Sequence, residues 1–244
     1  VEQDLDIWVA EKNPCDLIIA RRIFEHFENP GTVLDKLRKL GCGKLLLEVP
    51  DSTKSLTQGD VTMIWEEHKS YFTPGTLKNT LAAHGWEVTA ERLWPDAQED
   101  ILAVIATPIT TVNPHPTAEH EHSLGDHFVH LAEQHRLHIE SALVQSSKNA
   151  ILGVGHRSCA FVHYHRLQDH LFAAHDDNEH KTGHCFPGTR TAIVPTHELD
   201  ANTHLCLLAM SPSGARKVHE LLSPNYTRTK FASILPGSPL FEFN

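Results

Sequence analysis

Hydrophobic and polar positions along the first 110 residues switch between two periods, one typical of helices and one typical of strands. The segment 29–41 places Val33, Leu34 and Leu37 on one helical face, with Pro30 at its start and Gly41 at its end. Short apolar runs such as 44–50 are typical of buried strands. Helices are predicted at 4–13, 29–41 and 73–85, and strands at 15–20, 44–50, 86–94 and 101–107.

These elements predict an α/β fold, because helices and strands that alternate along a chain form a doubly wound, mainly parallel sheet. No helix separates the last two predicted strands, so one of them must run antiparallel to its neighbours. A long loop is expected between the strand that ends at Pro50 and the helix that begins at Thr73, its N-cap.

The rest of the chain predicts a linker, a long helix and a second, smaller α/β unit. Residues 110–122 are polar and unperiodic, whereas 123–148 carry an amphipathic pattern of six to seven turns. Strands are then predicted around 150–155, 171–176, 191–195 and 203–210, helices at 157–167 and 212–222, and an irregular tail at 235–244. We therefore expect three regions, 1–110, 111–148 and 149–244.

Charge and composition narrow the classes of partner. The formal net charge of -10 argues against nucleic acid and against an anionic membrane surface, since both favour a basic patch. We expect a small-molecule substrate instead, and the oligomeric state stays open. Five cysteines without a C-x-x-C pair form neither a disulfide framework nor a zinc ribbon, so a cytoplasmic location is expected.

One stretch concentrates acid, base and aromatic groups in front of a predicted helix. It reads "IWEEHKSYFTPGTL" over residues 64–77 and includes Glu67, His68 and Tyr71. A second polar group, His26 in "FEHFENP", follows the predicted strand at 15–20. Ligands of open α/β sheets bind at the carboxyl ends of strands, so both stretches are candidate site segments. A solvated turn is the plain alternative for 66–68.

The order of these motifs resembles the second half of a class I S-adenosylmethionine-dependent methyltransferase. The text "DLIIARRIFEHFENPGTVLDKLRKLGCGKLLLEVPD" is similar to the fourth and fifth strands of that family with the intervening helix. "IWEEHKSYFT" is similar to the "IYHEHxSYFS" segment of sugar C-methyltransferases. The resemblance implies a Rossmann-like methyltransferase sheet whose N-terminal half is absent, and S-adenosylmethionine as the cofactor of the complete protein.

The resemblance also implies a reaction, the C-methylation of a sugar nucleotide or another small carbonyl compound, and a role in it for three residues. A base must remove a proton from the carbon beside the carbonyl, and the enolate then attacks the methyl group. His68 is implied as the base, Glu67 as its partner and His26 as a further polar group. Trp65 stands where the family has tyrosine, and Glu66 where it has histidine, so two positions of the segment are altered.

The second unit resembles the C-terminal domain of the same sugar C-methyltransferases. "GVGHRS" follows a predicted strand, and "HDDNEHKTGHCFPGT" is similar to the family's acidic, K-x-G and PGT segments. Gly153 and Gly155 let backbone approach a ligand at a helix N-terminus, where an anion is favoured. The resemblance implies that this domain contacts the substrate and its diphosphate. The substrate-binding residues implied in the whole chain are Trp65, Tyr71, Gly155, His156, Asp177 and Lys181.

Two departures from the family bear on the expected activity. Gln98, Glu99 and Asp100 replace small residues that would admit a nucleotide-linked sugar. Nothing resembles the cofactor-binding first half of the fold, so the fourth strand of the family would lie exposed at an edge. We expect the sequence to be a piece of a longer protein, in which the activity resides.

Three alternatives stay open. "GVGHRS" with Asp176 about twenty residues on fits the fingerprint of an NAD-type oxidoreductase. Histidines at 127, 130 and 138 share one helical face and could bind zinc, although a solvated polar face is the simpler interpretation and no metal is expected at the candidate site. A non-catalytic pseudoenzyme or interaction domain would also be consistent with the altered Trp65 and Glu66.

Overall fold

The chain folds into two compact units of mixed α and β structure. A computed structural model describes residues 7, 11, 14–95, 99–110, 119–145 and 147–243. The first unit comprises 1–56 and 66–126, and the second comprises 57–65 and 127–244. The helix predicted at 4–13 lies almost wholly outside the described residues.

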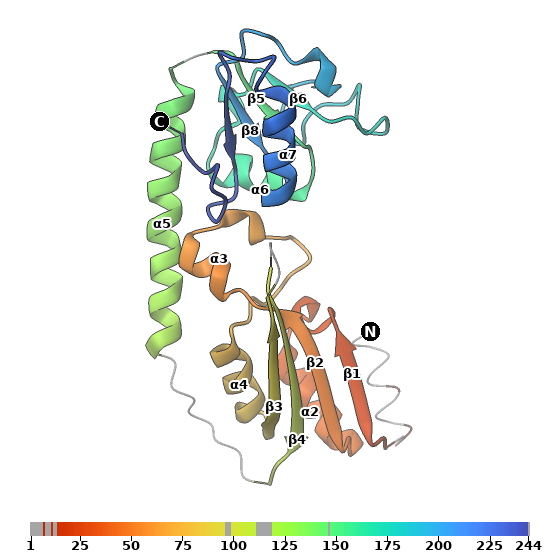
Figure 1. Ribbon diagram of the computed structural model, residues 1–244. Coiled ribbons are helices and arrows are strands. Elements are labelled where there is room, and N and C mark those ends of the chain that lie inside the picture. The colour runs from red at the N-terminus through yellow and green to blue at the C-terminus, as the bar shows by residue number, and fades with distance from the viewer. Residues whose placement is uncertain are drawn as a thin grey trace. The chain divides into compact units, whose positions relative to one another are not determined.

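The first unit contains a four-stranded sheet with helices packed on it (Figure 1). Its elements are β1 (Leu17–Arg21), the 3-10 helix η1 (Phe24–His26), α2 (Pro30–Leu40), β2 (Lys44–Pro50), α3 (Thr53–Gln58), α4 (Pro74–Ala83), β3 (Trp86–Trp94) and β4 (Ile101–Pro108).

The strand order β1-β2-β4-β3 confirms the antiparallel strand that the sequence required. β1 and β2 run parallel, with Leu17 opposite Lys44, whereas β4 runs antiparallel to both β2 and β3. The helix α2 connects the parallel neighbours β1 and β2, whereas no helix lies between β3 and β4 among the described residues. The carboxyl ends of β1 and β2 therefore share one edge of the sheet.

Capping residues fix the two helices of this unit where the sequence predicted them. The Asn29 side chain accepts a hydrogen bond from the Thr32 amide at 3.0 Å, and Gly41 ends α2 in the left-handed region with φ 82°. Thr73 caps α4 as predicted, by accepting the Thr76 amide at 3.0 Å.

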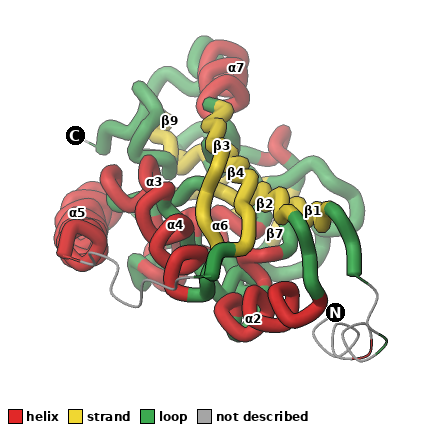
Figure 2. The backbone as a smooth tube through the Cα atoms, turned by 90° about the horizontal axis from the view of Figure 1, so that it is seen from below, coloured by secondary structure: helices red, strands yellow, loops and turns green. Residues whose placement is uncertain are grey.

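Both helices cover the same face of the sheet (Figure 2). Trp86 is fully buried in this core, and its indole N–H donates to the carbonyl of Leu34. Among the described residues, β1 is an edge strand of this sheet. Leu17 and Ile19 of β1 are 47% and 58% exposed, so this strand offers apolar surface as well as an unpaired edge.

The prediction of one long loop after β2 is wrong in part. Residues 51–73 contain α3 and a 3-10 helix, η2 (Val61–Met63). Asp51 begins α3 by accepting hydrogen bonds from both the amide and the hydroxyl of Thr53. Asp60 begins η2 by accepting the Thr62 amide. Short helices of one or two turns carry too few apolar repeats to appear in a periodicity pattern.

The second unit contains a five-stranded parallel sheet in the order β7-β6-β5-β8-β9. Its elements, besides η2, are α5 (Glu119–Leu143, from residue 127 on), β5 (Asn149–Leu152), α6 (His156–Tyr164), η3 (Gln168–His170), β6 (Ala173–His175), β7 (Ile193–Val194), η4 (Thr196–Glu198), β8 (Leu205–Leu208), α7 (Pro212–Leu222) and β9 (Lys230–Ser233).

This strand order places β5 and β8 at the centre, where all their residues are buried. The strand order reverses between β5 and β8, so the loops after these two strands flank the switch point of the sheet. The sequence did not predict β9, which pairs with β8.

Residues 57–65 join the second unit through close packing. Gly59 adopts φ 65°, and a Cβ at this position would lie 2.7 Å from the Cβ of Leu131 on α5. Glycine is therefore required both for the backbone conformation and for the close approach. The following helix, η2, packs on α6.

The long helix α5 begins four residues earlier and ends five residues earlier than the sequence predicted. Its apolar stripe is confirmed, since Phe128, Ile139 and Leu143 are buried. Asn149 fixes the C-terminal end, because its side-chain amide donates to the carbonyl of Leu143 at 2.7 Å. No helix among the described residues is long and apolar enough to cross a membrane.

Burial of His165 in the second unit makes folding stability depend on pH. Desolvation, assisted by the nearby His135 and Arg136, lowers the pKa of His165 to about 4. Because this folded-state pKa lies below that of the unfolded chain, His165 contributes its full stability above about pH 6.5 and loses it as the pH falls toward 4.

We expect unfolding in urea at pH 5 to show about 2 kcal/mol less stability from this group than at pH 7. His165→Leu should remove that part of the pH dependence, since the Nδ1 atom of His165 is buried without a hydrogen-bond partner. His180→Leu, at an exposed histidine, is the matched control. Equal pH dependence in both variants would contradict the prediction.

Candidate active site

Two segments of the first unit meet beyond the carboxyl ends of β1 and β2. The 3-10 helix η1 follows β1 and carries Glu25 and His26, and the segment 66–72 comes after β2 in the chain. The Phe72 carbonyl accepts a hydrogen bond from the Ser52 amide at 2.8 Å, just past the end of β2. The two predicted site segments are therefore brought together at the sheet edge that binds ligands in open α/β folds.

Backbone hydrogen bonds hold the 66–72 segment against η1. The carbonyl of Glu25 accepts both the Lys69 amide at 2.8 Å and the Ser70 amide at 3.1 Å. Phe72 is buried and stacks on Phe24, with ring centroids 5.4 Å apart. Residues 69–72 thus have a fixed position against η1, whereas Glu66 and Glu67 lie exposed in a turn, as in the alternative interpretation of 66–68.

The rings of His26, His68 and Tyr71 contact one another in series, although His26 is distant from the other two in the sequence. The His26 and His68 rings meet edge to face with centroids 4.9 Å apart. The Tyr71 ring also contacts His68, with centroids 6.0 Å apart. His26 and His68 are each partly exposed, so both rings are accessible to a small molecule.

Glu67 enters this cluster through its backbone. Its carbonyl oxygen lies 2.9 Å from Nδ1 of His26, a contact in which the imidazole must donate the hydrogen. That contact assigns the proton of neutral His26 to Nδ1 and leaves a lone pair on Nε2. The Glu67 side chain is exposed.

Glu25 is a site residue that the sequence did not single out. Its side chain is 2% exposed, its Oε1 lies 3.9 Å from Nε2 of His26, and its Oε2 is buried without a hydrogen-bond partner. Burial raises the pKa of the Glu25 carboxyl. The only sequence signal was its place beside His26, and an acidic residue there is expected to point into water.

Glu25, His26 and His68 are suited to hold a metal ion. One ligand atom from each lies within 4.8 Å of the others. In the described part of the chain, no other three His, Cys, Asp or Glu side chains come together in this way. The histidine stripe on α5 does not, because His127 contacts the carbonyl of Thr57 and His138 packs near Phe243.

The second unit brings together a different pair of predicted residues. Trp65 and His156 lie with ring centroids 5.2 Å apart and planes inclined by 35°. Nε2 of His156 lies 3.2 Å from the carbonyl of Thr62. Trp65 is 38% exposed, so the pair offers an aromatic surface at the N-terminus of α6.

The turn between β5 and α6 is held by charged side chains. Gly153 adopts φ 95°, and a Cβ there would lie 3.0 Å from the carbonyl of Ala209. Asp176 Oδ2 accepts the Val154 amide at 2.8 Å and the Lys181 ammonium at 2.9 Å. Burial favours a higher pKa for Asp176, but hydrogen bonds from Lys181, Asn178 and Val154 outweigh it, so the pKa lies below its ordinary value.

The side chains of Asp177 and Lys181 both form hydrogen bonds within the second unit. Lys181 also donates to the Val154 carbonyl, and Asp177 Oδ1 accepts the Thr196 amide at 2.7 Å. A Cβ added at Gly155 would meet no atom within 4 Å, so open space surrounds the start of α6. Asp176 closes this turn, which differs from the ribose contact expected of the acidic residue in an NAD site.

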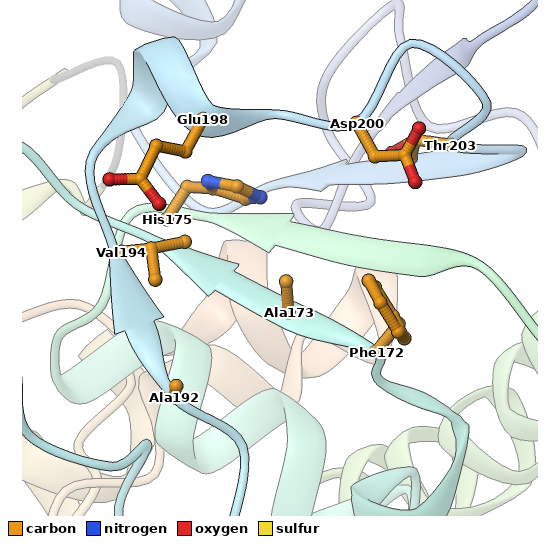
Figure 3. A pocket seen from close by; sticks show the side chains of 8 residues that line it. All are labelled: Phe172, Ala173, His175, Ala192, Val194, Glu198, Asp200 and Thr203. Atoms are coloured by element: carbon orange, nitrogen blue, oxygen red, sulfur yellow. The ribbon is translucent and has the colours of Figure 1, made fainter.

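A cavity of about 270 Å³ lies along β6 and β7 (Figure 3). The crossover from β6 to β7, residues 176–192, contains no helix, which leaves this end of the sheet less covered. Nε2 of the buried His175 has no hydrogen-bond partner, and its Nδ1 contacts the Pro195 carbonyl. The lining residues are Phe172, Ala173, His175, Ala192, Val194, Glu198, Asp200 and Thr203.

Comparison with known proteins concerns the first unit. Residues 1–91 match the model of a methyltransferase domain. No curated protein matches the chain. One similar solved structure is magnesium protoporphyrin IX methyltransferase from Synechocystis PCC 6803 with bound SAH, at 14% identity and a TM-score of 0.31. The match covers 38% of this chain and 44% of that chain.

Residues 1–91 are thus similar to a methyltransferase domain, the class that the sequence predicted for this part of the chain. The matched region contains η1 and the whole 66–72 segment.

Removing the Lys181 charge should loosen the turn before α6. We expect Lys181→Met to lower the free energy of unfolding by about 1 kcal/mol, because Asp176 loses a charge-assisted hydrogen bond while remaining partly buried. Hydrogen exchange at the Val154 and Gly155 amides should accelerate in the same variant. Lys217→Met, on an exposed position of α7, is the control and should leave both measurements unchanged.

Proposed function

We propose that the complete protein is an S-adenosylmethionine-dependent methyltransferase that methylates a carbon beside a carbonyl group of a small molecule. The observation that carries this proposal is the pairing of His26 and His68 at the carboxyl edge of β1 and β2, inside a region that matches a methyltransferase domain. A base at this edge is what carbon methylation requires, since the carbon must lose a proton to become a nucleophile.

His68 takes the proton in this proposal. Its ring lies on the segment fixed by Lys69 and Ser70, so a substrate would meet it in a defined position. His26, the last residue of η1, contacts the His68 ring and is the further polar group of the site. The exposed Glu67 carboxylate is close in sequence to His68 and would stabilise the imidazolium, while its carbonyl orients His26.

Bound S-adenosylmethionine would supply an electrophilic methyl group to that carbon. The described residues fit such a cofactor only in part. No glycine-rich turn follows β1 or β2, the two parallel strands described in the first unit. The unpaired edge of β1, with the exposed Leu17 and Ile19, is the place where a further strand of a methyltransferase sheet would pair.

The substrate class rests on the likeness of the sequence to sugar C-methyltransferases. Within the second unit, Trp65, His156 and the open space at Gly155 are the candidate contacts for a sugar nucleotide. Within the first unit, Tyr71 is a candidate substrate contact beside His68. Asp177 and Lys181 would act by shaping the second unit, in the region 149–244 that we assign to substrate binding. The altered Trp65 and Glu66 leave other small carbonyl compounds as acceptors.

The remaining expectations are part of the same proposal. A net charge of -10 favours a small molecule over nucleic acid as the partner. All five cysteines are free thiols, which favours a reducing compartment such as the cytoplasm.

His68→Ala tests the proposal in the complete protein. We expect transfer of a labelled methyl group to fall by at least about 100-fold, because a general base contributes a factor of this order. Calorimetric affinity for S-adenosylmethionine should stay within about twofold, since the ring acts on the acceptor.

The matched control is His130→Ala, which removes an exposed histidine of α5 and should leave methyl transfer unchanged. Wild-type turnover in His68→Ala would exclude His68 as the base. No binding of S-adenosylmethionine by the complete wild-type protein would exclude the methyltransferase itself.

A further inference from the structure

The buried carboxyl group of Glu25 lacks a partner for one of its two oxygens. Oε2 is inaccessible to solvent and accepts no hydrogen bond, while Oε1 faces Nε2 of His26 at 3.9 Å, beyond hydrogen-bond distance. A buried charge that is neither paired nor hydrogen-bonded is costly. A cation between Glu25 and the imidazoles would satisfy it.

His26 is oriented as metal-binding histidines are. Its Nδ1 donates to the backbone carbonyl of Glu67 at 2.9 Å, which leaves the Nε2 lone pair directed to the Glu25 side. Histidines that bind metals usually donate their other ring N–H to a carbonyl or carboxylate, which fixes the tautomer and the ring orientation.

His68 supplies the third ligand. Its ring is held edge to face against His26, and the ligand atoms of Glu25, His26 and His68 all lie within 4.8 Å of one another. Three ligands around tetrahedral zinc lie about 3.4 Å apart, given metal–ligand distances of about 2.0–2.2 Å. Rotation of the partly exposed His68 imidazole and of the Glu25 carboxyl group about their side-chain bonds can close the difference, while His26 keeps its contact with the Glu67 carbonyl.

The geometry points to a divalent transition-metal site, with Zn²⁺ bound by Nε2 of His26, an imidazole nitrogen of His68 and the carboxylate of Glu25. Two nitrogens and one oxygen favour zinc and its neighbours over Mg²⁺ or Ca²⁺, which prefer oxygen ligands. Three protein ligands leave a fourth position open to water or a substrate oxygen.

The site would also regulate the reaction, a consequence that rests on the proposed function. A metal that occupies the lone pair of His68 prevents this ring from accepting a proton. Zinc and the acceptor carbon therefore compete for the same imidazole, and zinc-loaded protein should transfer no methyl group.

Metal binding itself is tested with the 244-residue chain, independently of activity. Titration with ZnCl₂ in a calorimeter should show one site that Glu25→Gln and His68→Gln each weaken by at least about tenfold. Titration with CoCl₂ should give a visible absorption band that zinc displaces. Glu28→Gln is the matched control, because Glu28 is exposed and lies three residues along the chain. Circular dichroism at 222 nm verifies that each variant is folded.

The outcomes separate the metal site from the proposed function. Equal zinc affinity in wild type, Glu25→Gln and His68→Gln would overturn the site, and binding would then belong to other histidines. In the complete protein, zinc should abolish methyl transfer and EDTA should restore it. Methyl transfer that persists with saturating zinc would overturn the regulation, whereas zinc binding by a protein without methyl transfer would leave the site standing and remove the proposed function.

Discussion

The carbonyl oxygen of Glu25 is the contact on which the candidate site depends. It accepts two successive amides, from Lys69 and Ser70, and so fastens the 66–72 segment to η1. Without this contact, the residues between η2 and α4 would be a connecting segment with no preferred position beside η1. With it, His68 is held against His26, although the two residues lie 42 positions apart in the sequence. Phe72 closes the arrangement by inserting its ring into the core beside Phe24.

The side chain of Glu25 is buried beside the same contact. Desolvation then raises the pKa of the group, and the neighbouring lone pair of His26 adds no hydrogen to satisfy it. Glu25 must therefore carry a proton or face a cation. This environment suits both proposals for the site. A proton taken from the substrate and a bound zinc ion would each occupy a nitrogen of the imidazoles beside the carboxyl group.

The sequence predicted the elements whose ends are chemically marked. α2 and α4 begin at Asn29 and Thr73 and were located correctly because N-caps and an N1 proline are local signals. η2 and β9 were missed, since three or four residues carry too little periodicity to be distinguished from a loop. The motif match found His26 and His68. Glu25 was missed because its importance arises from burial, which depends on the fold of a distant segment.

A resemblance can single out residues of the second unit while leaving their roles undetermined. Lys181 and the acidic pair 176–177 were singled out by likeness to substrate-binding segments; Asp176 and Lys181 lie at the turn between β5 and α6, and Asp177 contacts the Thr196 amide. That turn lies at the switch point of a parallel sheet, where ligands bind in this architecture. Side chains that shape a binding turn and side chains that touch a ligand are both retained by a shared motif. Hydrogen-bond partners distinguish the two roles. Asp176 accepts the Val154 amide and Asp177 accepts the Thr196 amide, so both carboxylates shape the protein backbone.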